Sequence, residues 1–334
     1  MAQTERGPAD PSEPREPVVV AKGLSKSYRT GHIIQGRRPA LVDLDLQVLR
    51  GEIFGYVGPN GSGKTTTLKL FVGLLRPDRG EAKVLGEPLA SRAWRMRAGY
   101  LPENPYLYDY LTPAEYLDYA GRLFGMRRER RRERTRELLS LVGLERSAQL
   151  PMRRFSKGML QRAGLAQALV NDPELLFLDE PMSGLDPIGR RLVRDLILGL
   201  RKAGKTVFFS THILSDAETL CDRVAVLRAG RLLKVGPLGE LLRLDVAHME
   251  VFAAGIGAGA PGLAAAARVE RVGDRLRLEV EERSLGRVVT AIEAAGGRVL
   301  GVQPVRRTLE DYFFEEMGGA PGKGAAGAGA WGEG

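Results

Sequence analysis

Cysteine and long apolar runs are the scarcest features of this 334-residue sequence. Its single cysteine, Cys221, cannot form a disulfide within the chain, which excludes a disulfide-stapled scaffold and fits a reducing compartment. No run of about 18 apolar residues occurs, so the chain is not expected to span a membrane. Residues 1–17 are rich in proline and charge, lack the apolar core of a signal peptide and are expected to be disordered. Work at a membrane would therefore require partner proteins.

Aromatic residues are also few, at 6% of the chain, whereas basic residues are plentiful. Lysine and arginine number 50 against 41 acidic residues, and the formal net charge is +9. This balance favours anionic partners, such as nucleotides, nucleic acids or acidic lipid headgroups. The hydrophobic content of 43% permits an ordinary buried core, and the length suits one large domain with a small one.

Strand-like and helix-like segments alternate through the first 240 residues. A helical region is predicted to begin at Thr112 and to extend to about residue 150. Thr112 is its N-cap, Pro113 its first residue and Glu115 its third. Apolar or alternating runs predict strands at 18–28, 41–48, 51–58, 175–181 and 205–212, with a hairpin at 223–236. The pattern predicts an α/β domain with a parallel sheet over residues 18–240, including a helical subdomain at about 104–165.

The composition changes near residue 245. Strand patterns at 248–254, 275–280 and 298–304 alternate with helical patterns at 285–297 and 307–317. This order predicts a small C-terminal α+β domain over residues 245–317, of a ferredoxin-like kind. A role for this domain in supporting a dimer of the chain, or in regulation, is a hypothesis that rests only on its position in the sequence. Residues 318–334 contain eight glycines and are expected to form a flexible tail.

The strongest chemical motif is GPNGSGKTT, which matches G-x-x-x-x-G-K-[ST] between an apolar strand and a helix. Backbone N–H groups of such a loop cradle phosphates, the Lys64 ammonium contacts the β and γ phosphates, and the Thr65 hydroxyl ligates Mg²⁺. A chance match in a glycine-rich turn is the alternative, which the flanking strand and helix disfavour. The predicted ATP-binding residues are Gly58, Pro59, Asn60, Gly61, Ser62, Gly63, Lys64, Thr65 and Thr66.

Two adjacent carboxylates end the apolar run LLFLDE. We expect Asp179 to hold Mg²⁺ and Glu180 to activate the attacking water as a general base. Neighbouring residues on a strand point to opposite faces, so the two acids are suited to different tasks. An isolated acidic pair after a strand is more often a turn or capping feature, but the phosphate loop upstream favours function.

A second, incomplete anion site occurs at residues 153–162, RRFSKGMLQR. Ser156 and Gly158 open a predicted helix, and Arg153, Arg154, Lys157 and Arg162 surround its positive N-terminus. The sequence thus has two half-built phosphate sites but one complete phosphate loop.

Five motifs resemble, in order and spacing, those of ATP-binding-cassette proteins: GPNGSGKTT, FSKGMLQR, LLFLDEP, SGLDP and STH. The resemblance covers residues 18–236 and implies a P-loop NTPase core that binds ATP and Mg²⁺ and hydrolyses ATP. It assigns Ser156, Lys157 and Gly158 to the signature and Asp186 to the D-loop. It makes His212 the switch histidine that senses the γ-phosphate, and Tyr28 the ring stacked on adenine. A purely structural role for Tyr28 remains the alternative.

The resemblance also explains the two half-sites. In this family the signature of one chain caps the γ-phosphate held by a second copy, so a head-to-tail homodimer is implied. Two departures stand out: the signature reads FSKGM instead of LSGGQ, and Glu103 occupies the position of the usual Q-loop glutamine. Both departures resemble the branch that serves exporters with separate membrane subunits.

A partner surface is expected just after Glu103, where Tyr106, Leu107, Tyr108 and Tyr110 occupy the region in which such proteins receive a permease helix. Clustered aromatic residues are typical interface anchors. Packing within the domain is the alternative for any single one of them. The implied location is the cytoplasmic face of the cell membrane, through the permease.

The run RRERRRERTR at residues 127–136 contains seven arginines and two glutamates. A solvated helix face with Glu–Arg support is the favoured interpretation. Attraction to anionic lipid and binding of nucleic acid are the alternatives, although no nucleic-acid motif accompanies the run.

The sequence therefore predicts the ATP-hydrolysing subunit of an exporter, acting as a homodimer on a separately encoded permease. The alternative is a soluble cassette ATPase that acts on nucleic acid or ribosomes. One cassette, one cysteine and no long heptad repeat favour the transport role.

Overall fold

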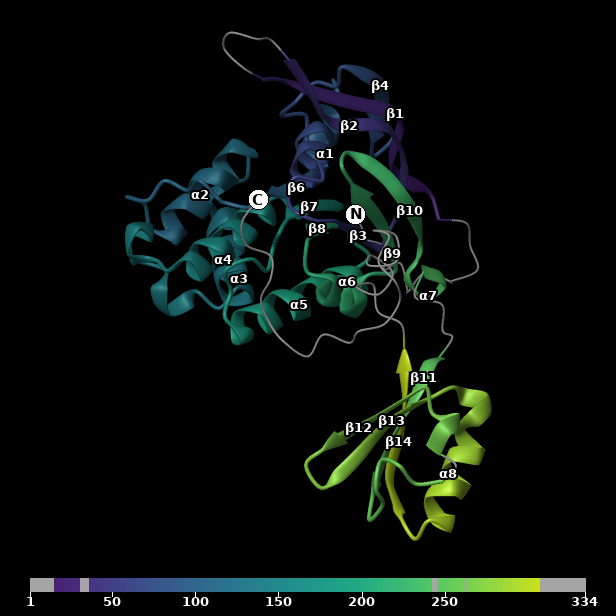
Figure 1. The fold of residues 1–334 in the computed structure, drawn as a ribbon. Helices are drawn as coiled ribbons and strands as arrows, with labels where there is room; N and C mark the ends of the chain where they lie inside the picture. The colour runs from purple at the N-terminus through teal and green to yellow at the C-terminus, as the bar shows by residue number, and fades with distance from the viewer. Residues whose placement is uncertain (1–14, 31–35, 242–245, 262, 307–334) are drawn as a thin grey trace. The chain divides into compact units, whose positions relative to one another are not determined.

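The computed structural model describes residues 15–30, 36–241, 246–261 and 263–306 (Figure 1). The chain divides into two compact units, Met1–Leu238 and Gly239–Gly334, each of which is described by itself. The helix expected at 307–317, the glycine-rich tail and all but the last residues of the N-terminal tail lie outside the described residues.

The first unit is built on a sheet with the strand order β10-β9-β3-β8-β7-β6. Its strands are β3 (Ile53–Val57), β6 (Ala98–Leu101), β7 (Leu175–Asp179), β8 (Thr206–Thr211), β9 (Arg223–Arg228) and β10 (Arg231–Pro237). Neighbouring strands are parallel except in the β9–β10 hairpin. Every residue of β3, β7 and β8 is buried, which explains their continuous apolar runs. The expected α/β class is confirmed.

A second sheet of the first unit is antiparallel, and the sequence does not predict it. Its order is β2-β1-β4-β5, formed by β1 (Pro17–Thr30), β2 (Gly36–Leu49), β4 (Arg79–Val84) and β5 (Glu87–Pro88). β1 and β2 exceed the predicted segments because their polar ends pair with each other, as Tyr28 pairs with Arg38. β4 has little hydrophobic signal because only Ala82 and Val84 are buried in it.

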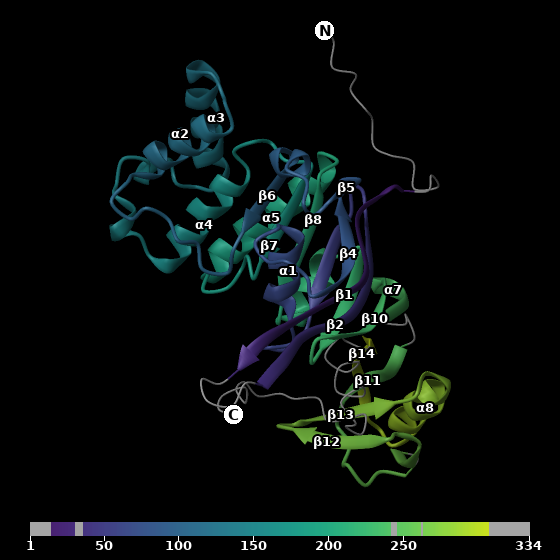
Figure 2. The same ribbon diagram turned by 90° about the horizontal axis from the view of Figure 1, so that it is seen from above.

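Helices cover the parallel sheet, and three of them form a group beside it (Figure 2). The helices of the first unit are α1 (Lys64–Phe71), α2 (Pro113–Leu123), α3 (Arg128–Leu141), α4 (Lys157–Ala168), α5 (Pro187–Lys202) and α6 (Leu214–Leu220), and α7 (Leu238–Leu241) follows at the boundary. The predicted start of α2 is confirmed: Thr112 and Glu115 form a reciprocal capping box. The helical group is α2, α3 and α4.

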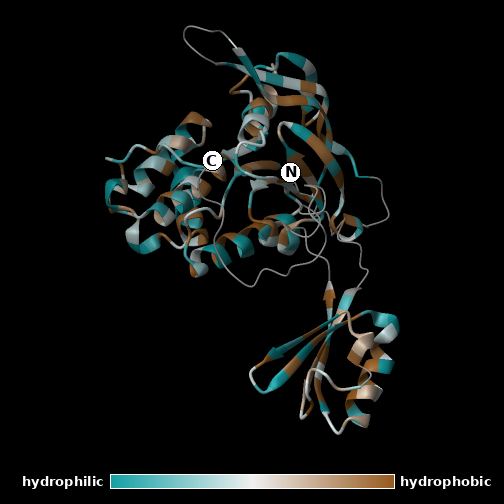
Figure 3. Ribbon diagram, viewed as in Figure 1, coloured by the Kyte–Doolittle hydropathy of each residue, from teal (hydrophilic) through white to brown (hydrophobic). Residues whose placement is uncertain are grey.

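The parallel sheet has a hydrophobic cluster on each face. On one face the ring of Phe208 lies 5.3–5.8 Å, between centroids, from the rings of Phe54, Tyr56, Phe71 and Phe177. This cluster also contains residues of β1, β2 and α1. Alternate residues of the same strands join the second cluster, which contains α4 and α5 (Figure 3). Burial on both faces fixes the strand ends that carry the polar residues described below.

The second unit is an antiparallel sheet with one helix against it. Its elements are β11 (Val246–Ala254), β12 (Arg268–Val272), β13 (Arg275–Val280), α8 (Leu285–Ala294) and β14 (Arg298–Arg306). Val251, Leu278, Val288 and Ile292 are fully buried in its core. The interleaved order β12-β13-β11-β14 resembles the expected ferredoxin-like arrangement, but a 3-10 turn at Leu263–Ala265 stands where that arrangement has its first helix. β12 was not predicted because most of its residues are exposed.

Because each unit has its own buried cluster, we expect a chain ending at residue 244 to fold and to bind an ATP analogue. Trp94 is buried in the first unit, so its fluorescence reports that unit once Trp331 is replaced by Phe. Urea unfolding should give a free energy of unfolding within roughly 1 kcal/mol of that of the full chain. A shortened chain without a cooperative transition would show that the units depend on each other.

Candidate functional site

The phosphate loop, GPNGSG, joins β3 to α1, and two of its glycines have no room for a side chain. A Cβ atom on Gly58 would lie 2.3 Å from the carbonyl oxygen of Leu227, and one on Gly63 would lie 2.3 Å from that of Ala40. Gly63 also has a φ of 107°, which residues with side chains rarely adopt. Gly61, by contrast, faces open space. The loop backbone therefore packs closely against Ala40 and Leu227 at Gly63 and Gly58, whereas the space next to Gly61 is open.

The first turn of α1 is open to an anion. Gly63 is its N-cap, and no side chain caps the helix, so the first N–H groups keep free hydrogen-bonding capacity. Within the described part of the chain, the buried hydroxyl of Ser62 has no hydrogen-bond partner. A phosphate group would satisfy both the hydroxyl and the amides, and the helix dipole would favour its charge.

Lys64 is buried at the start of this helix and is held by the loop itself. Its Nζ donates to the carbonyl oxygens of Gly58, at 2.6 Å, and Pro59, at 3.2 Å. It also lies 3.4 Å from Oε1 of Glu180. A buried ammonium requires such partners because an unpaired one is costly. Phosphate oxygens at the loop would compete for Lys64 and release Glu180 from it.

Asp179 is fully buried at the end of β7, where it pairs in register with Ser210 of β8. The Ser210 hydroxyl donates to Oδ1 at 2.6 Å, whereas Oδ2 has no hydrogen-bond partner among the described residues. Burial raises the pKa of Asp179, an effect that the Ser210 and Thr65 hydroxyls oppose and the Glu103 charge reinforces. An orphaned carboxylate oxygen close to the Thr65 hydroxyl fits Mg²⁺, which prefers oxygen ligands.

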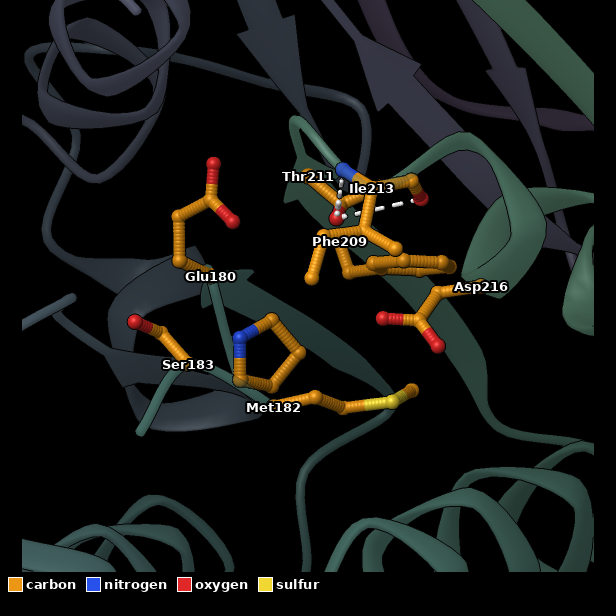
Figure 4. Close-up of a pocket in the computed structure, with 8 residues that line it drawn as sticks. Glu180, Met182, Ser183, Phe209, Thr211, Ile213 and Asp216 are labelled. Carbon is orange, nitrogen blue, oxygen red and sulfur yellow. Dashed lines mark hydrogen bonds between the residues drawn. The ribbon is translucent and has the colours of Figure 1, made fainter. Parts of the chain in front are cut away.

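Glu180 follows directly and is held in an uncommon backbone conformation, with a φ of 49°. Its N–H group donates to the Ser210 carbonyl oxygen at 3.2 Å. Its Oε2 lies 2.9 Å from Nδ1 of His212, while Oε1 faces Lys64. Figure 4 shows Glu180 on one side of a tight crevice, opposite Thr211. Both carboxylate oxygens thus have a fixed polar neighbour, and a carboxylate held in this way can accept a proton from a water placed beside it.

Two predicted residues lie at the margin of this cluster. Tyr28, at 41% exposure, has its hydroxyl 3.3 Å from the Thr66 hydroxyl, so the ring stands beside the phosphate loop. Glu103 is exposed, yet its charge is close enough to Asp179 to raise the pKa of that carboxyl. The structure therefore brings both residues to the same edge of the sheet as the buried acids.

Comparison with known proteins identifies the architecture. A family model described as "ABC transporter" matches residues 41–183. An uncharacterized ABC transporter ATP-binding protein of Synechocystis sp. is 43% identical over 311 residues, which cover 90% of this chain and 84% of that protein. The chain belongs to the ATP-binding-cassette (ABC) transporter family. It is an ABC ATPase, an enzyme that binds and hydrolyses ATP.

Relatives and solved cassettes agree with this assignment. The daunorubicin resistance ATP-binding protein DrrA3 of Streptomyces coeruleorubidus is 37% identical over 312 residues, covering 90% of this chain and 96% of DrrA3. The Nod factor export ATP-binding protein I of Ralstonia nicotianae is 37% identical over 241 residues, which cover 72% of this chain and 73% of that protein. The cassette MJ0796, solved as a dimer with ADP and Pi, matches with a TM-score of 0.61 and 28% identity, covering 66% of this chain and 98% of that one.

Among the residues that the structure describes, no helix combines the length and apolar character needed to cross a bilayer.

The residues that the resemblance assigns to the signature lie at the start of α4. Ser156 is the N-cap, and its hydroxyl accepts a hydrogen bond from the Met159 N–H group at 3.2 Å. The Lys157 side chain lies close to Gly184, because a Cβ atom added to Gly184 would be only 2.8 Å from that side chain. Over the described ranges, no hydrogen bond or ion pair joins Ser156, Lys157 or Gly158 to the phosphate loop. Among the described residues, the two half-sites thus share no polar contact.

Asp186, which the resemblance assigns to the D-loop, has a structural contact that the sequence analysis did not predict. It is the N-cap of α5, and its Oδ1 accepts from the Gly189 N–H group at 2.8 Å, with Pro187 in the first helical turn. A carboxylate in this place also faces the positive end of the helix.

Three residues around the site were not singled out from the sequence. Ser210 holds both acids, and its signal was the polar end of the strand TVFFST. The buried amide of Gln161 donates to the carbonyl oxygens of Glu180 and Pro181, each at 3.4 Å, and ties α4 to the segment after β7. Asp216 lines the crevice in Figure 4, and burial raises its pKa, while Arg190 and Arg194 oppose the effect. Gln161 and Asp216 gave no sequence signal apart from their place next to motifs.

Because burial raises the pKa of Asp179, its ionised form destabilises the folded chain. Protonated Asp179 contributes stability that is fully present below pH 3.8, the pKa of this group in the unfolded chain. The contribution is lost as the pH rises through the higher pKa of Asp179 in the folded chain. We therefore expect Asp179→Asn, which keeps an acceptor for Ser210, to have a melting temperature at neutral pH equal to or above that of the wild type. Its ATP hydrolysis should fall by roughly 100-fold or more.

The control is calorimetry with and without Mg²⁺ and ATP. Ligand should raise the melting temperature of the wild type more than that of Asp179→Asn. A variant that is strongly destabilised without ligand would contradict the buried-charge argument.

Proposed function

We propose that this ABC ATPase is the energising subunit of an exporter. It hydrolyses ATP with Mg²⁺ as a head-to-tail homodimer and drives a separately encoded permease at the cytoplasmic face of the membrane. One observation carries the proposal: the chain has a complete phosphate loop with an oriented carboxylate, and a cationic helix end that, among the described residues, has no hydrogen bond or ion pair to that loop.

The dimer follows from this incompleteness. A helix N-terminus such as that of α4, capped by Ser156 and flanked by Lys157, Arg153 and Arg154, is suited to a phosphate that a second chain presents. The solved relative MJ0796 is a dimer with ADP and Pi, which supports the same assembly here.

Within each composite site, the residues of this chain have separate tasks. Lys64 and the loop amides would bind the β and γ phosphates, and Thr65 and Asp179 would hold Mg²⁺, whose charge would offset that of the phosphates. Glu180 accepts the proton of the attacking water. His212 orients the Glu180 carboxylate through its Nδ1 contact, and in this proposal it also senses the γ-phosphate.

Export and a membrane partner are supported by the relatives, one of which is named for Nod factor export and another for daunorubicin resistance. The exposed tyrosines after Glu103, among them Tyr106 at 93% exposure, offer a surface for the permease. The alternative action on nucleic acid is not supported by any of these relatives' names.

The first prediction from this mechanism concerns Glu180→Gln. The amide keeps the shape of the carboxylate but loses the base, so ATP should bind within a few-fold of wild type while turnover falls by roughly 10²–10⁴. Equilibrium binding of a fluorescent ATP analogue and phosphate release measure the two quantities. Turnover within a few-fold of wild type would remove Glu180 from the mechanism.

The composite site is tested by mixing two inactive variants. Lys64→Ala damages the phosphate loop, and Gly158→Asp places a negative charge at the signature. A Cβ atom on Gly158 would lie 3.3 Å from Leu185, so Gly158→Ala is the matched steric control and should keep much of the activity. In a mixed dimer, one composite site carries both defects and the other carries neither.

Mixing with subunit exchange should therefore restore hydrolysis. Random pairing gives one intact site in about half of the dimers, so recovery is at most roughly a quarter of wild-type sites, and less if the sites are coupled. A linked dimer with one wild-type site shows whether a single site is competent. If that control is active and verified mixed dimers stay inactive, the composite site is wrong.

A further inference from the structure

The pairing of β1 with β2 places an arginine beside Tyr28. Tyr28 lies directly opposite Arg38 in the antiparallel register. The next pair towards the end of the ribbon is Arg29 with Arg37. Residues paired in this way point to the same face of a sheet, whereas neighbours along a strand point to opposite faces. Arg38 therefore shares the face of Tyr28, and the other two arginines share the opposite face.

The face that carries Tyr28 looks onto the phosphate loop. The Tyr28 hydroxyl lies 3.3 Å from the hydroxyl of Thr66, in the first turn of α1. Two residues after Arg38, the carbonyl oxygen of Ala40 lies 2.3 Å from the position of a Cβ atom on Gly63. Figures 1 and 2 both show β1 and β2 beside α1. Arg38 is thus paired with one of these contacts and at most about 7 Å along the strand from the other.

The guanidinium group of Arg38 is free among the described residues. Its side chain is exposed, and over these ranges it forms no hydrogen bond, ion pair or ring contact. Lys26, which lies on the same strand as Tyr28, is instead paired with Asp78 at 2.8 Å. A guanidinium group without a carboxylate keeps its full charge and its five donors for a ligand. A solvated surface arginine would look the same in isolation, so the position beside the ATP site decides the interpretation.

The order of the groups along ATP indicates which of them meets Arg38. In the proposed site the β and γ phosphates lie at Lys64, while Tyr28 offers an exposed ring on which the base can stack. The ribose and the α-phosphate join these two ends, so they must cross the space between them. Arg38 faces this space, and the α-phosphate is the anionic group there. Guanidinium groups bind phosphate oxygens through short, charge-assisted hydrogen bonds, often in pairs.

We propose that Arg38 is a nucleotide-binding residue that pairs with the α-phosphate of ATP. The proposal rests on the proposed function, because it adds a contact to the same ATP site. It names a residue outside the phosphate loop and the acidic pair, contributed by the antiparallel sheet that the sequence did not predict.

A contact to the α-phosphate has a distinctive kinetic effect. Hydrolysis breaks the bond between the γ-phosphorus and the oxygen that bridges it to the β-phosphate, so the α-phosphate is unchanged by the reaction. Arg38 would therefore bind the substrate and the transition state equally, which lowers KM without raising kcat. ADP keeps its α-phosphate, so Arg38 would hold the product as well.

The ribbon provides a matched control for the test. Arg37 and Arg38 are adjacent and exposed, and their replacement changes the net charge equally, but their side chains lie on opposite faces. The variants of the full chain are Arg38→Gln and Arg37→Gln, with Arg38→Lys as the conservative change. Titration calorimetry measures the affinity for ADP and for unlabelled, non-hydrolysable analogues of ATP and GTP. Phosphate release measures kcat and KM.

We expect Arg38→Gln to bind all three ligands roughly tenfold more weakly, by a common factor, because each carries the α-phosphate. KM should rise by a similar factor, while kcat stays within about twofold of wild type. Arg38→Lys keeps the charge but not the fork of donors, so it should recover part of the affinity. Arg37→Gln should match the wild type. The melting temperature of each variant without nucleotide should be unchanged, since both side chains are exposed.

Unchanged affinity of Arg38→Gln for all three ligands would overturn the proposal. An equal loss in Arg37→Gln would do the same, since it would reduce the effect to general charge. A loss confined to one of the two bases would assign Arg38 to the base and not to the phosphate, and a fall in kcat at constant KM would exclude the binding role. None of these results alters recovery in the mixed dimers or the effect of Glu180→Gln. Failure of this proposal is therefore distinguishable from failure of the proposed function.

Discussion

The hydrogen bonds at the carboxyl end of β8 hold the candidate site together. β8 lies between β3 and β7, so its last residues touch both the phosphate loop and the acidic pair. The Thr211 carbonyl oxygen accepts from the Gly58 N–H group, the Ser210 hydroxyl donates to Asp179, and the Ser210 carbonyl oxygen accepts from the Glu180 N–H group. Because the three strands are buried on both faces, this alignment cannot slip without exposing the core.

Much of this organisation could be predicted because it is local in sequence. The phosphate loop, the strand ending in Asp179 and the capping box of α2 each depend on residues within a few positions of one another. The sheet class followed from continuous apolar runs, since parallel strands are buried on both faces. What the sequence did not show depends on pairing between distant segments: Ser210 reaches Asp179 only through the register of β7 and β8, and Gln161 reaches Glu180 only through the packing of α4.

The missed strands have the same explanation. β4 and β12 bury few side chains, so they form because neighbouring strands offer hydrogen-bond partners, and hydrophobic patterning cannot detect them. The arginine run illustrates a further limit. The sequence favoured a single interpretation for the whole run, whereas in the structure Arg130, Arg131 and Arg134 form ion pairs within the helical group. Among the described residues, Arg128, Arg132 and Arg136 have no acidic partner and line a groove between α2 and α3.

The Gln161 amide has a mechanical consequence. Its two hydrogen bonds to the Glu180 and Pro181 carbonyl oxygens are long, at 3.4 Å each, and wholly buried. Bonds of this length are close to the distance at which a hydrogen bond is lost, and losing both leaves a buried amide unsatisfied, at about 1–3 kcal/mol. A displacement of α4 relative to β7 by a few tenths of an ångström is therefore enough to change the hydrogen bonding of the Glu180 carbonyl oxygen. One buried side chain thus makes the position of α4 and the peptide group of Glu180 depend on each other.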